Sequence, residues 1–278
     1  MWRVWRMIGI GYRKPLAGWI ESRPAEVDCL EITAEHFFGE GEDKLRLLTP
    51  AFHLFVHGLG LSLGTPGPLD KSRLQKFARV SELANPDWIS EHVAFTRTAE
   101  ADLGHLNPIA PTREFLGIMA DHAREISDYC RKPLILENIT SHVRLQGELS
   151  ETDFLNALCE RADCGLLLDV TNLFINSRNH GFDAVEWLHE LEPNRITQLH
   201  IVGYSVQGNR YADSHGEDVQ DELLQLLGEV LKYAPVKALI LERDENFPTP
   251  TRIAAELSKL RHVFATNRSR HRAEPAAP

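Results

Sequence analysis

Eight short apolar runs recur through this 278-residue chain, and their spacing limits its fold more than any other feature. Most of the runs are continuously apolar, which is typical of parallel strands that are covered on both faces. We therefore expect a parallel sheet whose strands span residues 7–12, 28–33, 52–57, 87–93, 133–138, 165–170, 196–202 and 237–242.

Segments with helical periodicity lie between the apolar runs. The segment 112–130 begins with a Thr that is a candidate N-cap, and it places Phe115, Met119 and Ile126 on one stripe. Eight strands that alternate with helices over ~260 residues predict an α/β fold, a (β/α)8 TIM barrel, with an open doubly wound sheet as the alternative. The other expected helices are at 70–84, 150–161, 185–191, 221–233 and 251–264, with a short one at 15–22.

Length and composition fit a single domain. Hydrophobic residues make up 43% of the chain and charged residues 25%, which are ordinary globular values. No linker or repeat divides the chain, so we expect one catalytic domain over residues 1–265 and a disordered tail over residues 266–278. The N-terminal segment lacks the features of a signal peptide, and no run reaches the ~18 apolar residues that a membrane span needs.

Charge and cysteine content narrow the class of protein. The net charge is −10, from 40 acidic and 30 basic residues, which argues against a general nucleic-acid binder because acidic surfaces repel the phosphate backbone. The four cysteines are too few and too scattered for a disulfide scaffold, and they lack the CxxC spacing of redox and zinc motifs. We expect Cys29 and Cys164 to be buried and the protein to work in the cytoplasm.

Imidazole and carboxylate side chains follow six consecutive expected strands at the points where these strands end. In a barrel, the C-terminal ends of the strands face one shared cavity, so these side chains should converge. A single histidine at a strand end is more often hydrogen-bonded than metal-bound, but four buried carboxylates would cost several kcal/mol each without cations. Four carboxylates balance two divalent cations, which predicts a cluster of two or three metal ions. The residues are His57, His92, Glu137, Asp169, His200, Asp213, His215 and Glu242.

Three other features are weaker signals. The glycine-rich run 58–67 lacks the Lys-Ser/Thr ending of a P-loop, so we interpret it as a turn after the third strand and not as a phosphate cradle. Glu91 precedes His92 on one strand and should therefore point away from the lumen. His180 is either a group that faces substrate or a hydrogen-bonding residue of its loop.

Together these motifs resemble the multinuclear non-heme iron-dependent oxidases that modify ribosomally made peptides. That family includes the methanobactin-biosynthesis oxidase and the enzyme that excises a cysteine β-carbon on the way to 3-thiaglutamate. The resemblance covers nearly the whole chain and is specific only when the motifs are taken together. The motifs are GIGYR (9–13), VHGLGLSLG (56–64), ISEHVAF (89–95), LILENITS (134–141), LLLDVTNLFINSRNHGFD (166–183), LHIVGY (199–204), ADSHG (212–216) and LERD (241–244).

The resemblance also implies a ligand set, which is similar to that of the trinuclear apurinic endonucleases among the wider xylose-isomerase-like barrels. Asn172 joins the eight residues above as a ninth ligand, at a position where the endonucleases have histidine. The family resemblance further implies two or three iron ions of mixed valence (Fe2+/Fe3+), with O2 as cosubstrate. The implied substrate is a cysteine of a precursor peptide, and the implied partner is a separate peptide-recognition protein.

Three other functions remain open from the sequence. The same nine positions could hold three metal ions that activate water in a phosphoesterase acting on abasic DNA, although the charge of −10 argues against it. A sugar isomerase generally has a lysine near its metals, and no such lysine ends an expected strand. A non-enzymatic role in metal or copper handling is the last alternative.

Overall fold

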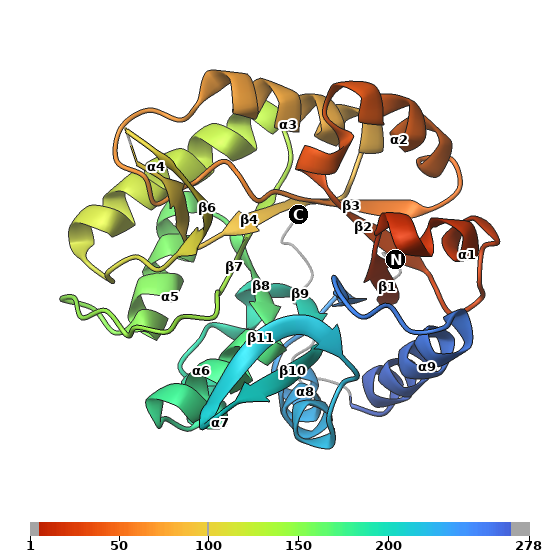
Figure 1. Ribbon diagram of the computed structural model, residues 1–278. Helices are drawn as coiled ribbons and strands as arrows, with labels where there is room; N and C mark the ends of the chain where they lie inside the picture. The colour runs from red at the N-terminus through yellow and green to blue at the C-terminus, as the bar shows by residue number, and fades with distance from the viewer. Residues whose placement is uncertain (1–5, 99, 268–278) are drawn as a thin grey trace, which may run out of the picture.

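A closed barrel of eight parallel strands forms the centre of the molecule (Figure 1). The computed structural model describes residues 6–98 and 100–267. The order around the barrel is β1-β12-β9-β8-β7-β4-β3-β2, so the first strand pairs with the last and closes the sheet. This confirms the predicted TIM barrel. The barrel strands are β1 (Met7–Gly11), β2 (Cys29–Thr33), β3 (His53–His57), β4 (Ile89–His92), β7 (Leu134–Glu137), β8 (Gly165–Asp169), β9 (Ile196–Ile201) and β12 (Ala238–Leu241).

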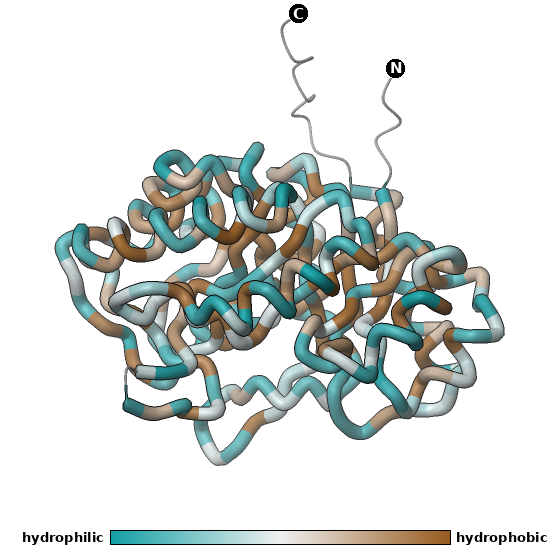
Figure 2. The backbone as a smooth tube through the Cα atoms, turned by 90° about the horizontal axis from the view of Figure 1, so that it is seen from above, coloured by the Kyte–Doolittle hydropathy of each residue, from teal (hydrophilic) through white to brown (hydrophobic). Residues whose placement is uncertain are grey.

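Helices form a ring around these strands and bury their apolar faces against them (Figure 1). Figure 2 shows the hydrophobic stretches gathered toward the inside and polar residues on the outer turns. None of the helices among the described residues has the length and apolar character needed to cross a membrane. The α-helices are α1 (Ala17–Glu21), α2 (Glu42–Leu48), α3 (Lys71–Ala84), α4 (Arg113–Cys130), α5 (Glu151–Ala162), α6 (Val170–His180), α7 (Ala184–His189), α8 (Asp221–Tyr233) and α9 (Pro250–Thr266).

Two helices and two hairpins were not expected from the sequence. Helix α6 was missed because it begins directly after β8, with no polar loop between the two, so the apolar pattern runs on across the boundary. Helix α2 has only seven residues, too few for a clear periodicity. The hairpins rise from the ends of β4 and β9 and consist of β5 (Phe95–Arg97) with β6 (Asp102–Asn107), and β10 (Gly203–Gln207) with β11 (Arg210–Glu217).

Every second side chain of a barrel strand faces the lumen, so the side chains inside the barrel lie in layers. Phe55 and His57 lie two positions apart on β3, so both side chains face the lumen, and the same spacing relates Ile135 to Glu137 on β7. The lower, N-terminal layer is an apolar cluster, and the ionisable residues follow it toward the C-terminal end. The lower cluster comprises Met7, Cys29, Phe55, Trp88, Ile135, Leu167, Ala238 and Ile240.

Close strand packing requires a glycine at position 9, and two of the expected buried residues are cysteines. A Cβ at Gly9 would lie 2.4 Å from the carbonyl oxygen of Cys29, so only glycine lets β1 approach β2 this closely. All four cysteines are free, and Cys29 and Cys164 are buried as expected. The expected tail lies outside the described residues from position 268 onward, and the domain division at residue 265 stays a prediction.

Candidate metal centre

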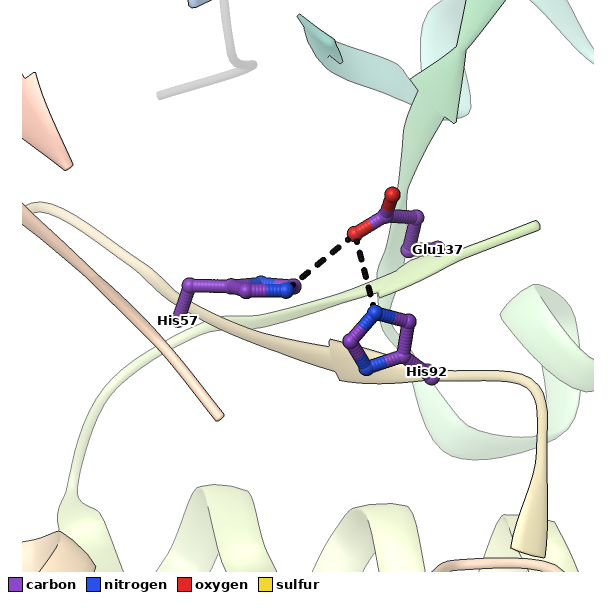
Figure 3. Close-up of side chains that lie close together, drawn as sticks. All are labelled: His57, His92 and Glu137. Carbon is purple, nitrogen blue, oxygen red and sulfur yellow. Dashed lines mark ion pairs between the residues drawn. The ribbon is translucent and has the colours of Figure 1, made fainter. Parts of the chain in front are cut away.

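The ends of β3, β4 and β7 bring three ligand-type side chains to one point. Nε2 of His57 lies 3.3 Å and Nε2 of His92 lies 3.4 Å from the same oxygen, Oε2 of Glu137 (Figure 3). All three residues are buried, and their ligand atoms lie within 4.8 Å of one another. Two imidazoles and a carboxylate at this spacing form a donor set that suits a divalent first-row metal.

Neighbouring residues orient these two imidazoles. Nδ1 of His57 lies 2.8 Å from Oγ of Ser90, whose hydroxyl donates to the carbonyl oxygen of Val56 at 3.4 Å. The oxygen of Ser90 is therefore the acceptor for the Nδ1 proton, which leaves the Nε2 lone pair of His57 free. On the next strand, Glu91 accepts the backbone N–H of His92 at 2.7 Å and lies 3.5 Å from Nδ1 of its ring.

A second cluster shares Glu137 with the first. Oε1 of Glu137 lies 3.3 Å from Nδ1 of His200, and the same nitrogen lies 2.9 Å from Oε2 of Glu242. Asp169 completes this group of four buried residues, whose ligand atoms also lie within 4.8 Å of one another. Glu137 thus turns one oxygen toward each cluster, which is the geometry of a carboxylate that can bridge two cations.

A third group lies at the mouth of the site and consists of His215, Glu242 and Asp244. Nδ1 of His215 lies 3.1 Å from Oδ2 of Asp244 and 3.8 Å from Oε2 of Glu242. Asp213 lies on the other side of the ring, with Oδ1 2.8 Å from Nε2 of His215. His215 and Asp244 are more accessible than the residues of the two buried clusters, whereas Glu242 is buried and also belongs to the second cluster.

Arg13 is a fixed cation beside the third group. Its Nη2 lies 3.2 Å from Oε1 of Glu242, and its Nε contacts Asp244. Burial alone would raise the pKa of Glu242, but His200, His215 and Arg13 outweigh this effect and hold it well below its usual range. Arg13 occupies one oxygen of Glu242 and leaves the other facing the histidines.

Several buried ligand atoms make no hydrogen bond among the described residues. They include Oε2 of Glu137, Oδ2 of Asp169 and Nδ1 of both His200 and His215. Burial, followed by the nearby carboxylates of Glu137 and Asp213, raises the pKa of Asp169 to about 8. Buried polar atoms without a hydrogen-bond partner destabilise the folded protein, and so does a buried carboxylate that lies close to other carboxylates. Cations bound among these side chains would remove both sources of destabilisation. The residues therefore fit a centre of divalent metal ions.

Asn172 differs from the other eight predicted ligands. Its Oδ1 accepts a hydrogen bond from the hydroxyl of Thr140, and its Nδ2 donates to the carbonyl oxygen of Asn138 at 3.1 Å. Its backbone N–H donates to Oδ1 of Asp169 at 2.7 Å, which caps helix α6. The amide of Asn172 is thus engaged with the loop after β7, and its role as a metal ligand stays a prediction.

The weaker sequence signals have structural roles. The backbone N–H groups of Leu59 and Leu61 donate to the carboxylates of Glu35 and Glu91 at 3.0 and 2.7 Å. Because these amides are already bound to anions, the glycine-rich loop does not offer them to a phosphate. His180 is the last residue of α6, and its Nε2 lies 2.8 Å from the carbonyl oxygen of Ser141, so it joins α6 to the loop after β7.

Sequence reasoning missed three residues of the site. Asp244 lies two positions after Glu242, and this spacing could have indicated it. Glu31 stands between Leu30 and Ile32 in the apolar run 28–33, and an acidic residue between two apolar ones is itself a signal of a buried polar role. Arg13 follows β1 in the motif GIGYR, but the distance of about 230 residues along the chain hid its contact with Glu242 and Asp244.

The fold and the three clusters define a TIM barrel whose C-terminal end gathers histidines and carboxylates able to hold metal ions. Residues 7–265 match the family described as RiPP precursor modification enzyme MbnB/TglH/ChrH, and this chain belongs to that family.

Relatives that match this chain over nearly all of their own length are named UPF0276 proteins. A UPF0276 protein of Shewanella oneidensis is 32% identical over 263 residues, which is 93% of this chain and 94% of that protein. A UPF0276 protein of Pseudomonas aeruginosa is 36% identical over 266 residues, covering 92% and 91%.

Solved structures show the fold alone. The D-psicose 3-epimerase of Clostridium cellulolyticum has a TM-score of 0.62 at 12% identity, covering 95% of this chain and 99% of the epimerase. A xylose isomerase domain protein of Planctomyces limnophilus has a TM-score of 0.60 at 11% identity, covering 95% and 98%. The predicted barrel of the xylose-isomerase-like type is confirmed.

Proposed function

We propose that this protein is an iron-dependent oxidase that uses O2 to modify a cysteine of a ribosomally made precursor peptide. Its membership in a family of precursor-modifying enzymes supports a peptide substrate. The observation that carries the proposal is Glu137, whose two oxygens face two separate groups of buried ligands. Such an arrangement suits two metal ions held side by side, with a third group at the mouth.

The nine proposed ligands divide among three ions. His57, His92 and Glu137 would hold the first ion, and Glu137 would also contribute to the second with Asp169, His200 and Glu242. A third ion would use only His215 from the group at the mouth, together with Asp213 on the other side of its ring and with Asn172 after a change of its hydrogen bonds. Bound iron would supply redox chemistry with O2 and an affinity for the substrate thiolate.

The protein's own side chains do the positioning. Ser90 holds the ring of His57, and Arg13 restrains Glu242 and Asp244 at the open side of the site. The buried walls keep bulk water from the two inner clusters. We further propose that a separate protein recognises the precursor peptide and that the enzyme works in the cytoplasm, where its four free cysteines stay reduced.

Anaerobic loading with Fe2+ tests this function. We expect two or three irons per chain, a spectroscopic signature of coupled iron ions, and O2 consumption that depends on a cysteine-containing precursor peptide. The same peptide with serine in place of cysteine is the control. A protein that keeps only zinc after the iron-loading step, takes up no iron and consumes no O2 would contradict the proposal.

A DNA-nicking assay distinguishes the proposed oxidase from the main alternative, a phosphoesterase. A trinuclear phosphoesterase would cleave abasic duplex DNA when loaded with zinc or manganese, whereas the oxidase should leave it intact. Metal binding with neither O2 consumption nor cleavage would instead favour a metal-handling role.

A further inference from the structure

Two hydrogen bonds and one ion pair form a chain that runs through the barrel from its lower apolar layer to the central cluster. Nε1 of Trp88 donates to Oε1 of Gln198 at 2.8 Å, and Nε2 of Gln198 donates to Oε2 of Glu31. The other oxygen of Glu31 lies 2.6 Å from Nε2 of His200. All four residues are buried, and they come from β2, β9 and the segment leading into β4.

The direction of this chain is set at its lower end. An indole N–H can only donate, so the amide of Gln198 must turn its oxygen toward Trp88 and its NH2 group toward Glu31. A carboxylate accepts on both oxygens, so Glu31 accepts the amide N–H of Gln198 on Oε2, while its Oε1 stabilises a proton on Nε2 of His200 at 2.6 Å. Nε2 of His200 also lies 3.3 Å from Nε2 of Gln198, where it could only accept, but its contact of 2.6 Å with Oε1 of Glu31 is much shorter and favours a proton on Nε2.

We propose that Glu31 is a positioning residue that keeps the proton of His200 on Nε2, so that Nδ1 is free to bind the central metal ion. Nδ1 is the atom of His200 that faces Glu137 and Glu242, at 3.3 and 2.9 Å. Carboxylates that orient metal-binding imidazoles in this way raise metal affinity by fixing the ring and its tautomer. The inference rests on the proposed metal centre but not on iron or oxidase chemistry.

Glu31→Gln tests the direction of the hydrogen bonds. The amide of the new glutamine must turn its oxygen toward the NH2 group of Gln198, so its own NH2 group faces Nε2 of His200. Nε2 then has to accept, which moves the proton to Nδ1 and places it where the metal binds. We expect zinc affinity at one site per chain to fall by at least about 10- to 100-fold, measured by titration against a competing chelator.

A second substitution should rescue the first. Trp88→Phe keeps an aromatic ring against Phe55, with which the indole stacks at 4.5 Å between ring centroids, but it removes the donor that orients Gln198. In Glu31→Gln/Trp88→Phe the amide of Gln198 is free to turn over, and zinc affinity should recover most of the loss. A merely structural role of Glu31 predicts the opposite, since the double variant would be worse than either single one.

Glu35→Gln is the matched control. Glu35 is a partly buried glutamate just after β2 that accepts the backbone N–H of Leu59. Among the described residues, no hydrogen bond or ion pair joins Glu35 to a histidine of the centre. We expect its zinc affinity to match that of the wild type. Unchanged affinity in Glu31→Gln, or failure of the double variant to recover, would overturn the inference.

The wild-type protein provides a measurement that needs no variant to fold. NMR of 15N-histidine in the zinc-loaded protein should place the metal on Nδ1 and the proton on Nε2 of His200. Zinc bound to Nε2 would overturn the role of Glu31. Zinc binding as expected, without O2 consumption after iron loading, would contradict the proposed function and leave this inference standing.

Discussion

Glu137 is the residue with the largest expected effect on the site, because it belongs to both buried clusters. Glu137→Gln keeps the shape of the side chain but removes its charge and replaces one ligand oxygen by an NH2 group. We expect the loss of at least one metal ion per chain and of cysteine-dependent O2 consumption, measured by metal analysis after identical anaerobic loading.

Glu151→Gln is a control for removing a partly buried carboxylate elsewhere. Glu151 accepts the indole N–H of Trp187 at 3.2 Å, and burial raises its pKa. Its replacement should leave metal content unchanged. If Glu137→Gln kept its full metal content and its turnover, Glu137 would not be shared between two ions, and the proposed ligand set would be wrong.

Asn172 is the residue at which the proposal and the observed hydrogen bonds differ most. Asn172→Ala leaves Thr140 and the carbonyl oxygen of Asn138 without this partner, at a cost of about 1–3 kcal/mol in the free energy of unfolding. We expect it to lower metal content by no more than one ion, whereas Asn172→His should tighten the third site. Loss of two ions in Asn172→Ala would show that this residue supports the inner clusters.

Asp169 shows how one element boundary serves both fold and site. It ends β8, and its Oδ1 caps α6, while its Oδ2 faces the central cluster without a hydrogen bond. Asn is as good an N-cap as Asp, so Asp169→Asn should keep the stability of the metal-free protein and lose the central ion.

Asp169→Ala separates these two roles. It removes the cap as well as the ligand, and we expect it to be about 0.5–2 kcal/mol less stable than Asp169→Asn in denaturant unfolding of the metal-free protein. Equal stability of the two variants would show that the cap contributes little to stability. Full metal content in Asp169→Asn would show that Asp169 is not a metal ligand.

The stability of the whole molecule should depend on pH in the metal-free protein more than in the metal-loaded protein. In the metal-free protein, Asp169 has a pKa of about 8, and Glu137 and Glu91 outweigh the effect of burial and raise the pKa of His92 to about 9. Both raised values mean that the folded state holds more protons than the unfolded chain between pH 6.5 and 8. Stability therefore falls as pH rises through this window.

Thermal unfolding measures this effect. We expect the Tm of the metal-free protein to drop by roughly 3–6 °C between pH 6.5 and 8. The metal-loaded protein should show no such drop, because metal binding requires the deprotonated ligands and strengthens as pH rises. The same drop in both forms would indicate that the ions do not bind at Asp169 and His92.

Sequence alone determined the barrel and most of the candidate ligands. Parallel strands can be recognised as continuous apolar runs because both of their faces are covered, and the histidine or carboxylate residues that end six of the eight runs mark the shared cavity. His57, His92, Glu137 and Asp169 could be assigned to one site without coordinates, since closure of the barrel brings all strand ends together. The family resemblance could be recognised from the sequence because most of its motifs lie at these strand ends.

Only the tertiary structure decided which atoms face one another. Helix α6 had no boundary signal, because Asp169 ends the strand and caps the helix at once. The contact of Arg13 with Asp244 and the position of Glu31 beneath His200 depend on the register between strands that are far apart in the chain. Side-chain identity at a strand end predicts that a group can bind a metal, but the rotamers and hydrogen bonds that choose its binding atom arise only when the barrel closes.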